Sequence, residues 1–375
     1  MNASGRLTMP GKGGCGMKSY WNSRARTCFA TAVLLTFMAA VLPIYAASAP
    51  AGFGSSLEEV VKLAQKEGKV RVSASLGPAE VSTVLEGFYK RYPAVKVEYN
   101  STTGIDSGER IFTEALSGLV EFDAIKIVAE QQSQFVKGGV LAGPFNWQHY
   151  FPKTPKEHVS PNGYLTGGSF YPRVIAYNPS LVPRERVPRK WDDCLDPYWK
   201  GKLVMDMRPA ALVSLYPAWG EQRILQFAKR IKELNPSWQR GVTKTLTMIA
   251  AGEFPMVCGT AYSSVDSVLR KDPTAKLKVA WPDEIPVSLN ESLGIMKGAK
   301  FPNAGLLLSG WLASTEAQKG YDKVGRGSPF LEGTDTWKDF KEARAKAIFT
   351  GWDEGDYAPA LTKKITAIWG LAAAK

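Results

Sequence analysis

Apolar strand segments and helical segments alternate twice along this chain of 375 residues, and this order limits the fold more than any other feature. In the first series, the spacing of apolar residues predicts strands at Lys69–Ala74, Val95–Tyr99 and Phe122–Val128. The segments between them, Ala79–Tyr92 and Gly108–Leu119, have the spacing of amphipathic helices. Strands that are joined through helices pair in parallel, so this order predicts an α/β fold.

A second α/β series follows a segment rich in proline and glycine between residues 143 and 168. The expected strands of this series are Val174–Tyr177, Leu203–Met205, Met256–Cys258 and Leu277–Ala280. The expected helices are Glu221–Leu234, Gly241–Ala251 and Ser263–Arg270, and the tail is expected to be helical over Asn303–Ser314 and Asp339–Lys375. Two such series predict two lobes, and the natural ligand site of two α/β lobes is the cleft between them.

The first lobe is expected to consist of two separate segments of the chain, with the second lobe between them in the sequence. We expect residues 47–170 and a return segment, 287–338, to form the first lobe, and residues 171–286 to form the second. Residues 339–375 would then be C-terminal helices that pack on the second lobe or on the hinge.

The N-terminal segment has the order of a secretory signal peptide. Lys18, Arg24 and Arg26 precede an uncharged apolar run, Phe29–Leu42, and small residues follow it. The run is about 14 residues long, short of the roughly 20 that span a bilayer. We therefore expect residues 1–46 to be removed, with cleavage first at Ala46–Ala47 and otherwise by residue 49, and either Met1 or Met17 as the start. The protein would be exported to the periplasm.

Net charge and cysteine content limit the classes of partner and the covalent links that are expected. The chain has 47 basic and 35 acidic residues, a net charge of +12, and without residues 1–46 the net charge is +7. The lysines are scattered, so nucleic acid is not an expected partner. Two cysteines of the mature chain, Cys194 and Cys258, stand 64 residues apart. An oxidising compartment permits a bond between them, but the burial habit of free cysteine favours two buried thiols.

Familiar catalytic motifs are missing from the sequence. It contains no Gly-x-Ser-x-Gly elbow, no His-Glu-x-x-His and no Gly-x-x-x-x-Gly-Lys phosphate loop. The two histidines, His149 and His158, stand without a nucleophile signature, so surface or hydrogen-bonded roles are favoured over catalysis. These absences argue against an enzyme without excluding a secreted α/β enzyme that uses Asp or Tyr side chains. The sequence predicts no cofactor and no metal site.

Polar loops at strand ends are the candidate ligand contacts of the first lobe. The loop from Asn100 to Arg110 follows a strand and opens a helix, which suits an anion or a polar ligand but equally suits plain helix capping. It supplies Thr102, Thr103 and Ser107, and the loop after the first strand supplies Ser75. Lys126 is a weaker candidate, because it interrupts an apolar strand where a buried lysine would need a partner.

Several segments resemble a known family. The most specific is Pro188–Leu203, PRKWDDCLDPYWKGKL, which is similar to the P-x-x-W-x-D-L-x-D-P-x-W-K-G-K signature of solute-binding proteins of the ferric-iron, polyamine and phosphonate type. Further similar elements are Val70–Ser75, Phe122–Ala124, Arg173–Asn178, Ala250–Met256 and Lys297–Ala304. The resemblance covers nearly all of the mature chain. It implies a two-lobed periplasmic-binding-protein fold of type II, with a central cleft and hinge strands, that feeds an ATP-driven importer.

The resemblance also places candidate contacts in the second lobe. Ferric-binding members have two neighbouring tyrosines after a glycine, whereas Gly259–Ser263 offers Tyr262 alone. One tyrosine is a poor ferric site, so we expect a small organic or oxyanionic ligand, with ferric-ion binding as the alternative. Arg173 and Arg208 end or begin expected strands, and a guanidinium group suits a carboxylate or a phosphate. Arg110 is a further cation that could serve in this way, and for each arginine a surface or structural role is the duller interpretation.

The expected mechanism is closure of the two lobes on one ligand. We place the hinge at Tyr171–Tyr177 and Trp281–Leu289, where the chain should cross between lobes. Closure would then be a population shift driven by contacts made only in the closed state. The expected partners are a small-molecule ligand and the membrane permease of the importer, and the protein is expected to be a monomer.

Overall fold

The computed structural model describes residues 49–102 and 105–371. The predicted signal peptide and Thr103 lie outside the described residues. Within the described part of the chain, no helix combines the length and the apolar character that crossing a membrane requires.

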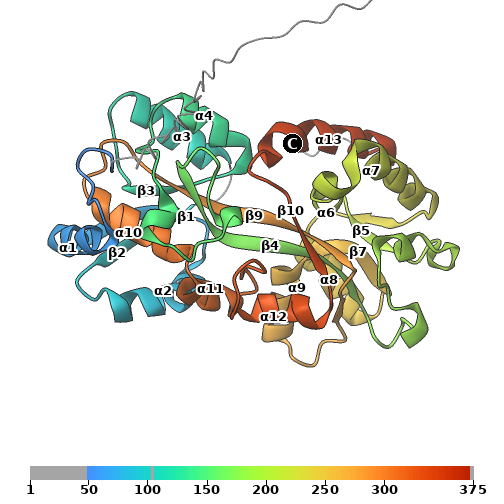
Figure 1. Ribbon diagram of the computed structural model, residues 1–375. Coiled ribbons are helices and arrows are strands. Elements are labelled where there is room, and N and C mark those ends of the chain that lie inside the picture. Colours follow the sequence, from blue (N-terminus) through green and yellow to red (C-terminus); the bar gives the residue numbers. More distant parts are fainter. Residues whose placement is uncertain (1–48, 103–104, 372–375) are drawn as a thin grey trace, which may run out of the picture. The chain divides into compact units, whose positions relative to one another are not determined.

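The first lobe is built around three parallel strands (Figure 1). Strand β1 (Lys69–Ala74) lies between β2 (Lys96–Ser101) and β3 (Ala124–Ile127), with Val72 opposite both Tyr99 and Ala124. The helices of this lobe are α1 (Leu57–Glu67), α2 (Pro78–Arg91), α3 (Ile105–Leu116), α4 (Gln132–Lys137), α5 (Trp147–Tyr150), α10 (Pro302–Leu312) and α11 (Thr315–Asp322). Parallel pairing between helix-linked strands was predicted from the sequence and is confirmed here.

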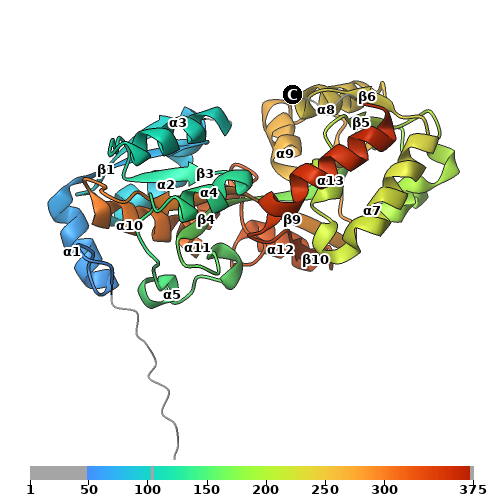
Figure 2. The ribbon, with the colours of Figure 1, turned by 90° about the horizontal axis from the view of Figure 1, so that it is seen from above.

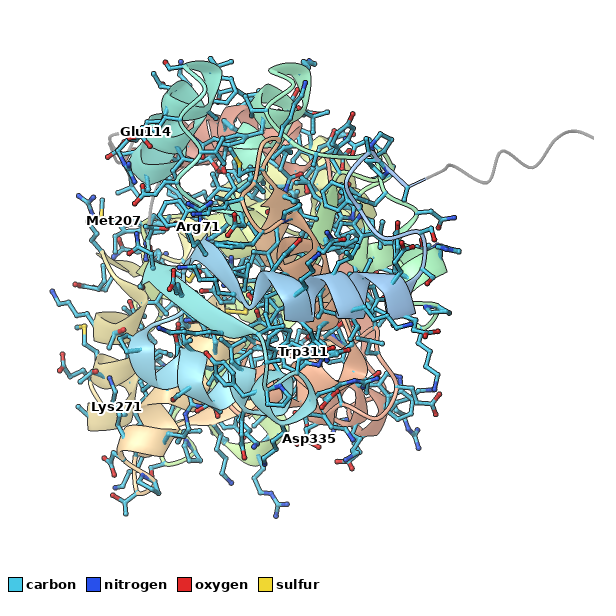
Figure 3. The ribbon with its side chains drawn as sticks, turned by 90° about the vertical axis from the view of Figure 1, so that its left-hand side faces the viewer. Arg71, Glu114, Met207, Lys271, Trp311 and Asp335 are labelled. Carbon is cyan, nitrogen blue, oxygen red and sulfur yellow. A yellow bond between two sulfur atoms is a disulfide. The ribbon has the colours of Figure 1, made fainter. Side chains whose placement is uncertain are left out.

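The core of the first lobe lies between its strands and helices α1, α2, α10 and α11. It contains Val70, Phe88 and Trp311, all at most 2% exposed. The rings of Phe88 and Trp311 pack edge to face with centroids 5.3 Å apart, and Figure 3 labels Trp311. Helix α1 covers this core. It begins after Ser56, whose side chain accepts a hydrogen bond from the Glu59 amide. It ends at Gly68, whose φ of 74° favours glycine.

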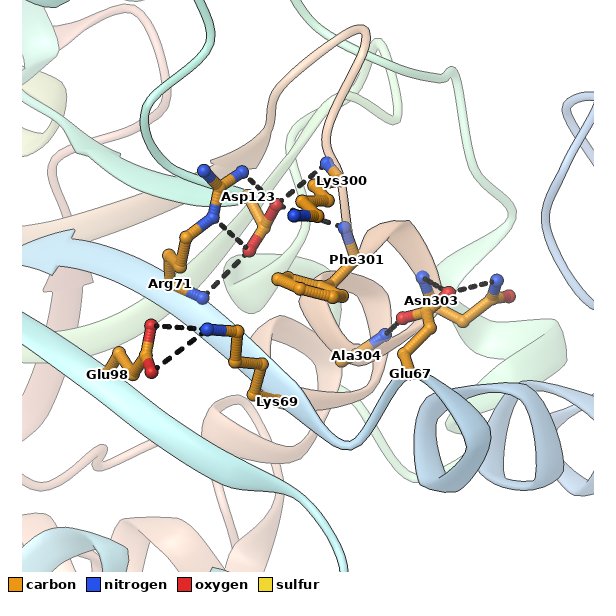
Figure 4. Close-up of polar contacts among 9 residues, drawn as sticks. All are labelled: Glu67, Lys69, Arg71, Glu98, Asp123, Lys300, Phe301, Asn303 and Ala304. Carbon is orange, nitrogen blue, oxygen red and sulfur yellow. Dashed lines mark hydrogen bonds and ion pairs between the residues drawn. The ribbon is translucent and has the colours of Figure 1, made fainter.

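A buried carboxylate just before β3 connects β1, the central strand of the first lobe, to the start of α10 (Figure 4). Asp123 is fully buried and accepts hydrogen bonds from the backbone amide, Nε and Nη2 of Arg71. It also accepts from the backbone amides of Lys300 and Phe301, which precede α10. The hydrogen bond to Asp123 raises the pKa of Arg71. Asp123 therefore joins three chain segments that are distant in the sequence.

Two long strands run through both lobes. β4 (Leu165–Tyr177) and β9 (Glu284–Ile295) pair antiparallel from Leu165 opposite Gly294 to Pro172 opposite Val287. In the first lobe β9 also pairs antiparallel with β3. β10 (Lys346–Phe349) lies parallel to the other end of β9, so three strands form the crossing ribbon (Figures 1 and 2). Helix α12 (Asp335–Glu342) precedes β10.

The second lobe surrounds the far end of β4. There β4 pairs antiparallel with β7 (Met256–Ala261) and β8 (Lys278–Ala280), and a separate parallel pair is formed by β5 (Val204–Asp206) and β6 (Ser237–Gln239). The helices are α6 (Ala210–Val213), α7 (Tyr216–Glu233), α8 (Val242–Ala251), α9 (Tyr262–Lys271) and the C-terminal α13 (Glu354–Trp369). Leu361, Ile365 and Trp369 of α13 belong to the core of this lobe together with Trp191, Trp199 and the α7 side chains.

Short 3-10 helices occupy the segments between these elements. They are η1 (Ala129–Gln131), η2 (Lys156–His158), η3 (Arg184–Arg186), η4 (Trp191–Leu195) and η5 (Pro197–Trp199). η4 and η5 lie in the Trp–Asp–Pro–Trp segment, whose two tryptophans are 1% and 2% exposed. That burial agrees with a packing role for this segment.

Two expectations from the sequence are wrong in the structure. The tail expected to be helical contains β10, which β9 holds as a strand. Cys194 and Cys258, expected as free thiols, form a disulfide with Cα atoms 6.1 Å apart. η4 and β7 bring them together, which no local pattern encodes.

Candidate functional site

Two cavities meet at the crossing ribbon and share Tyr171 and Arg173 of β4. The hinge cavity, of about 230 Å³, lies among the segment after β3, the crossing strands and the start of α13. Its polar lining is Lys126, Glu130, Gln132, Tyr171, Arg173, Ser288, Asn290, Ser292 and Glu354. The second-lobe cavity, of about 320 Å³, is lined by Tyr171, Arg173, Asp206, Arg208, Ala210, Ala211, Val242, Gly259, Thr260, Ala261 and Ser264.

Arg173 stands where the two cavities join. The β4–β7 pairing sets it opposite Ala261, and its guanidinium lies 5.4 Å from the centroid of the Tyr171 ring. Its Nη2 donates a long hydrogen bond, 3.4 Å, to Ser288 Oγ, while its buried Nε has no hydrogen-bond partner. Burial lowers the pKa of Arg173, and the charge of Glu354 opposes this shift. A guanidinium whose buried Nε lacks an acceptor is suited to binding an anion.

The second-lobe cavity offers more groups that suit an anion. Thr260 is 5% exposed, and its hydroxyl is buried without a hydrogen-bond partner. It stands just before α9, a helix of 10 residues whose first turn receives no side-chain cap. Free amides at a helix start favour negative charge. Arg208 lies at the same cavity but is held in a bidentate pair with Asp206, at 3.0 and 2.7 Å, and this hydrogen bonding raises its pKa.

The hinge cavity has acidic groups as well as a lysine. Glu354, in the first turn of α13, accepts a 3.0 Å hydrogen bond from Thr350 Oγ1. Burial raises the pKa of Glu354 to about 7, against the lowering effects of Thr350 and Arg173. Burial also lowers the pKa of Lys126, which the charge of Glu291 opposes. The cavity therefore contains charges of both signs close to the ribbon.

A buried glutamate organises the neighbouring part of the first lobe. Glu291 is 1% exposed and accepts hydrogen bonds from the amide and the hydroxyl of Ser75, both at 2.8 Å. The hydroxyl of Tyr321 donates to its other oxygen at 3.2 Å. Since these contacts connect β9 to the loop after β1, Ser75 serves here to position Glu291.

The structure brings together some of the side chains predicted as ligand contacts. Lys126, Arg173 and Arg208 line the two cavities. Ser75 bonds to Glu291, and the Thr102 hydroxyl lies 2.7 Å from that of Ser73. Neither cavity is lined by Ser75, Thr102, Ser107 or Tyr262. Any ligand contact by these residues stays a prediction.

Other candidates from the sequence have local partners. Tyr262 begins α9, packs on Trp281 with ring centroids 5.2 Å apart, and directs its hydroxyl to Asp339 at 3.4 Å. Burial raises its pKa. Arg110 pairs with Glu114 and Glu121 on and after α3, at 2.6 and 3.5 Å. These contacts explain the positions of both side chains without a ligand.

The two histidines also have structural partners. His158 is fully buried, with Nε2 2.7 Å from Ser328 Oγ, and burial lowers its pKa to about 3. His149 Nε2 lies 2.8 Å from the Ser55 carbonyl oxygen.

Sequence reasoning missed many of the side chains that line the cavities, among them Tyr171, Thr260, Ser288 and Glu354. Thr260 lies within the Gly259–Ser263 segment that was considered, but attention fell on Tyr262. Tyr171 and Ser288 lie within the predicted hinge segments, which were considered as backbone only. Glu354 had no sequence signal, because the tail was expected to be one helical region.

Comparisons with known proteins identify the class. A family model for bacterial extracellular solute-binding proteins matches residues 126–355, more than half of the chain. The chain belongs to this family. A search of curated proteins finds no match.

Solved structures share the fold. Iron-bound HitA from Pseudomonas aeruginosa is 16% identical with a TM-score of 0.63, over 79% of this chain and 99% of that one. A Trichodesmium protein, IdiA (FutA), in complex with iron and citrate, is 19% identical with a TM-score of 0.65, over 80% and 99%. An ABC transporter substrate-binding protein from Bradyrhizobium japonicum is 16% identical with a TM-score of 0.62, over 80% and 99%.

The chain is thus a bacterial extracellular solute-binding protein, and its fold is the two-lobed fold of these solved binding proteins. The family resemblance and the fold class that the sequence predicted are confirmed. Members of this family are bacterial extracellular solute-binding proteins.

Proposed function

We propose that this protein captures a small organic ligand through a carboxylate or another oxyanion, bound at Arg173, and that the two lobes close on it. The observation that carries the proposal is the Arg173 side chain, whose buried Nε has no hydrogen-bond partner at the junction of both cavities. A ligand oxyanion would supply the missing acceptor and the compensating charge. Thr260 and the uncapped start of α9 are additional donors on the second-lobe side.

The proposal extends to the setting in which the protein works. Residues 1–46 would direct export to the periplasm, where the mature chain would act as a monomer and pass its ligand to the permease without chemical change. Neither a cofactor nor nucleic acid takes part. In this proposal the chain passes from the first lobe to the second at residues 170–171, returns at 286–287, and enters its C-terminal segment at 338–339. The crossing ribbon is the hinge.

The test is binding of anions by the mature protein and by an Arg173→Ala variant. A thermal-shift screen of carboxylates, phosphonates, sugars, amines and metals comes first, because a ligand at 100 times its Kd adds about 2.7 kcal/mol of stability. Calorimetric titration of the best anion should then show a loss of about a thousandfold in Arg173→Ala, in line with the roughly 2–5 kcal/mol that an unpaired buried charge costs.

Matched variants distinguish a loss of binding from a loss of folding. Arg173→Lys keeps the charge but loses the planar fork, so an intermediate affinity is expected. Arg223→Ala on α7, where Arg223 pairs with the exposed Asp192, is the control and should bind as wild type does. Affinities within threefold of wild type in both Arg173 variants would overturn the anion proposal.

Two other functions have distinct signatures in the same experiments. Ferric-ion binding would give visible charge-transfer absorbance through the Tyr262 phenolate, and the hydroxyl of Tyr262 does lie 3.4 Å from the carboxylate of Asp339. An enzyme would consume the stabilising compound, whereas a transport protein returns it unchanged after denaturation.

A further inference from the structure

The charges that line the two cavities are balanced. Among the described residues, the cations are Lys126, Arg173 and Arg208, and the carboxylates are Glu130, Glu354 and Asp206. A dianionic ligand would leave this site with excess negative charge in a poorly solvated space. A ligand with no net charge but with separated ends fits the balance better, because each end can meet an opposite charge.

The pairing of these charges leaves one carboxylate dependent on Arg173. Arg208 is already held by Asp206. Lys126 faces Glu291 and Glu130, which are the carboxylates that act on it. The cation that acts on Glu354 is Arg173. If Arg173 binds the anionic group of a ligand, Glu354 loses part of its compensation and needs a second cation.

The surroundings of Glu354 leave room for such a cation. It lies in the lining of the hinge cavity, and of the described residues Thr350 alone donates a hydrogen bond to its carboxylate, at Oε2. The remaining oxygen can accept from an ammonium group. Its position is well fixed, because α13 packs into the second-lobe core and its second residue, Gly355, has no room for a Cβ against the Ala129 carbonyl.

We infer that the ligand is a small zwitterion of the amino-acid type, whose ammonium group pairs with Glu354 while its anionic group binds at Arg173. The inference rests on the proposed function and deepens it. Glu354 would be the residue that selects such ligands over simple carboxylates and dicarboxylates.

The ionisation of Glu354 makes the selection dependent on pH. The groups that face it are Thr350 after β10, Asp353 beside it, Glu130 on η1, Arg173 on β4 and Tyr357 one turn along α13. With a pKa of about 7, the ionised fraction of Glu354 rises roughly tenfold from pH 6 to pH 8. The affinity for a zwitterion should rise by about the same factor.

The experiment titrates matched ligand series of three to six carbons into the mature protein at pH 7.5. The series are ω-amino acids, the corresponding unaminated monocarboxylates, and the corresponding dicarboxylates. The expected result is that an ω-amino acid binds the wild type at least 30-fold more tightly than its unaminated partner. In Glu354→Gln this ratio should fall below threefold, and the rise in affinity between pH 6 and pH 8 should vanish.

Controls separate the outcomes. Glu221→Gln removes an exposed carboxylate of α7 that pairs with Lys364 of α13, and it should retain the wild-type ratio. If monocarboxylates or dicarboxylates bind as well as ω-amino acids in a manner that depends on Arg173, the zwitterion inference is wrong and the anion proposal stands. If no compound of any series binds, the zwitterion inference is wrong, and the anion proposal is wrong as well if the phosphonates of the screen also fail to bind.

Discussion

At the residue scale, a single buried carboxylate holds together three segments of the first lobe. Asp123 accepts five hydrogen bonds from Arg71, Lys300 and Phe301 (Figure 4). Both of its oxygens are used, so an amide at this position would turn donors against donors. The family-like Phe122–Ala124 segment therefore has a structural reason for its acid.

We predict that Asp123→Asn lowers the free energy of unfolding by about 3 kcal/mol, because it leaves Arg71 and buried amides without their acceptor. Urea unfolding followed by circular dichroism measures this change. Glu98→Gln is the comparison, since the Lys69–Glu98 pair has side chains 39% and 37% exposed, and its loss should cost roughly 0.5 kcal/mol. Equal effects of the two substitutions would contradict the prediction.

The candidate site shows how far residue-level reasoning reaches. Arg173 was predictable because a guanidinium at the start of a crossing strand suggests an anion contact. Thr102 and Ser75 were predicted from their places at strand ends, but the structure gives each a partner within the protein. A polar side chain beside a helix start suits a cap, a network and a ligand equally, and only the three-dimensional arrangement decides between them.

At the element scale, most strands and helices followed from periodicity, whereas β9 and β10 of the crossing ribbon did not. Strand β9 contains Pro286 and a mixture of polar and apolar residues, and β10 is four residues long. Their strand conformation comes from pairing with each other and with β4, residues far away in the sequence. Local propensity carries little information on such partners.

Gly259 of β7 lies in close contact with Ala211 of α6, and both residues line the second-lobe cavity. Gly259 has a φ of 113°, and a Cβ there would lie 2.5 Å from the Cβ of Ala211 in α6. We predict that Gly259→Ala destabilises the second lobe by about 2 kcal/mol and weakens ligand binding, since both strain and the displaced α6 act on the cavity.

Thermal unfolding and calorimetry measure both effects of that substitution. Gly252→Ala is the matched variant, because Gly252 also has a positive φ, 85°, but a Cβ there would come no nearer than 3.9 Å to Asn178. It should cost only the backbone term of about 1 kcal/mol and leave binding intact. Normal binding by Gly259→Ala would show that this contact is not needed.

At the scale of the whole molecule, the second lobe is closed by a covalent link between distant segments. The disulfide joins Cys194 of η4 to Cys258 of β7, 64 residues later, within the core of Trp191 and Trp199. Such a link suits a protein that folds after export, because the oxidising compartment keeps it intact.

We predict that the double variant Cys194→Ala, Cys258→Ala loses about 4 kcal/mol of stability, since a loop of this length is then free in the unfolded chain. Chemical unfolding with and without a thiol reductant measures it. The reductant should lower the stability of the wild type and leave that of the double variant unchanged. A wild type that is indifferent to complete reduction would disprove the contribution of the disulfide.

The crossing ribbon has a mechanical consequence. β4, β9 and β10 lie side by side where the lobes are joined, and β10 leads directly into the helix that carries Glu354. A ribbon of three hydrogen-bonded strands has greater torsional rigidity than a pair of single strands, so twist between the lobes is resisted while flexing across the ribbon is not. Because β9 connects the strand of Arg173 with the strand that precedes Glu354, the lobe closure that we propose should change the relative positions of these two side chains little.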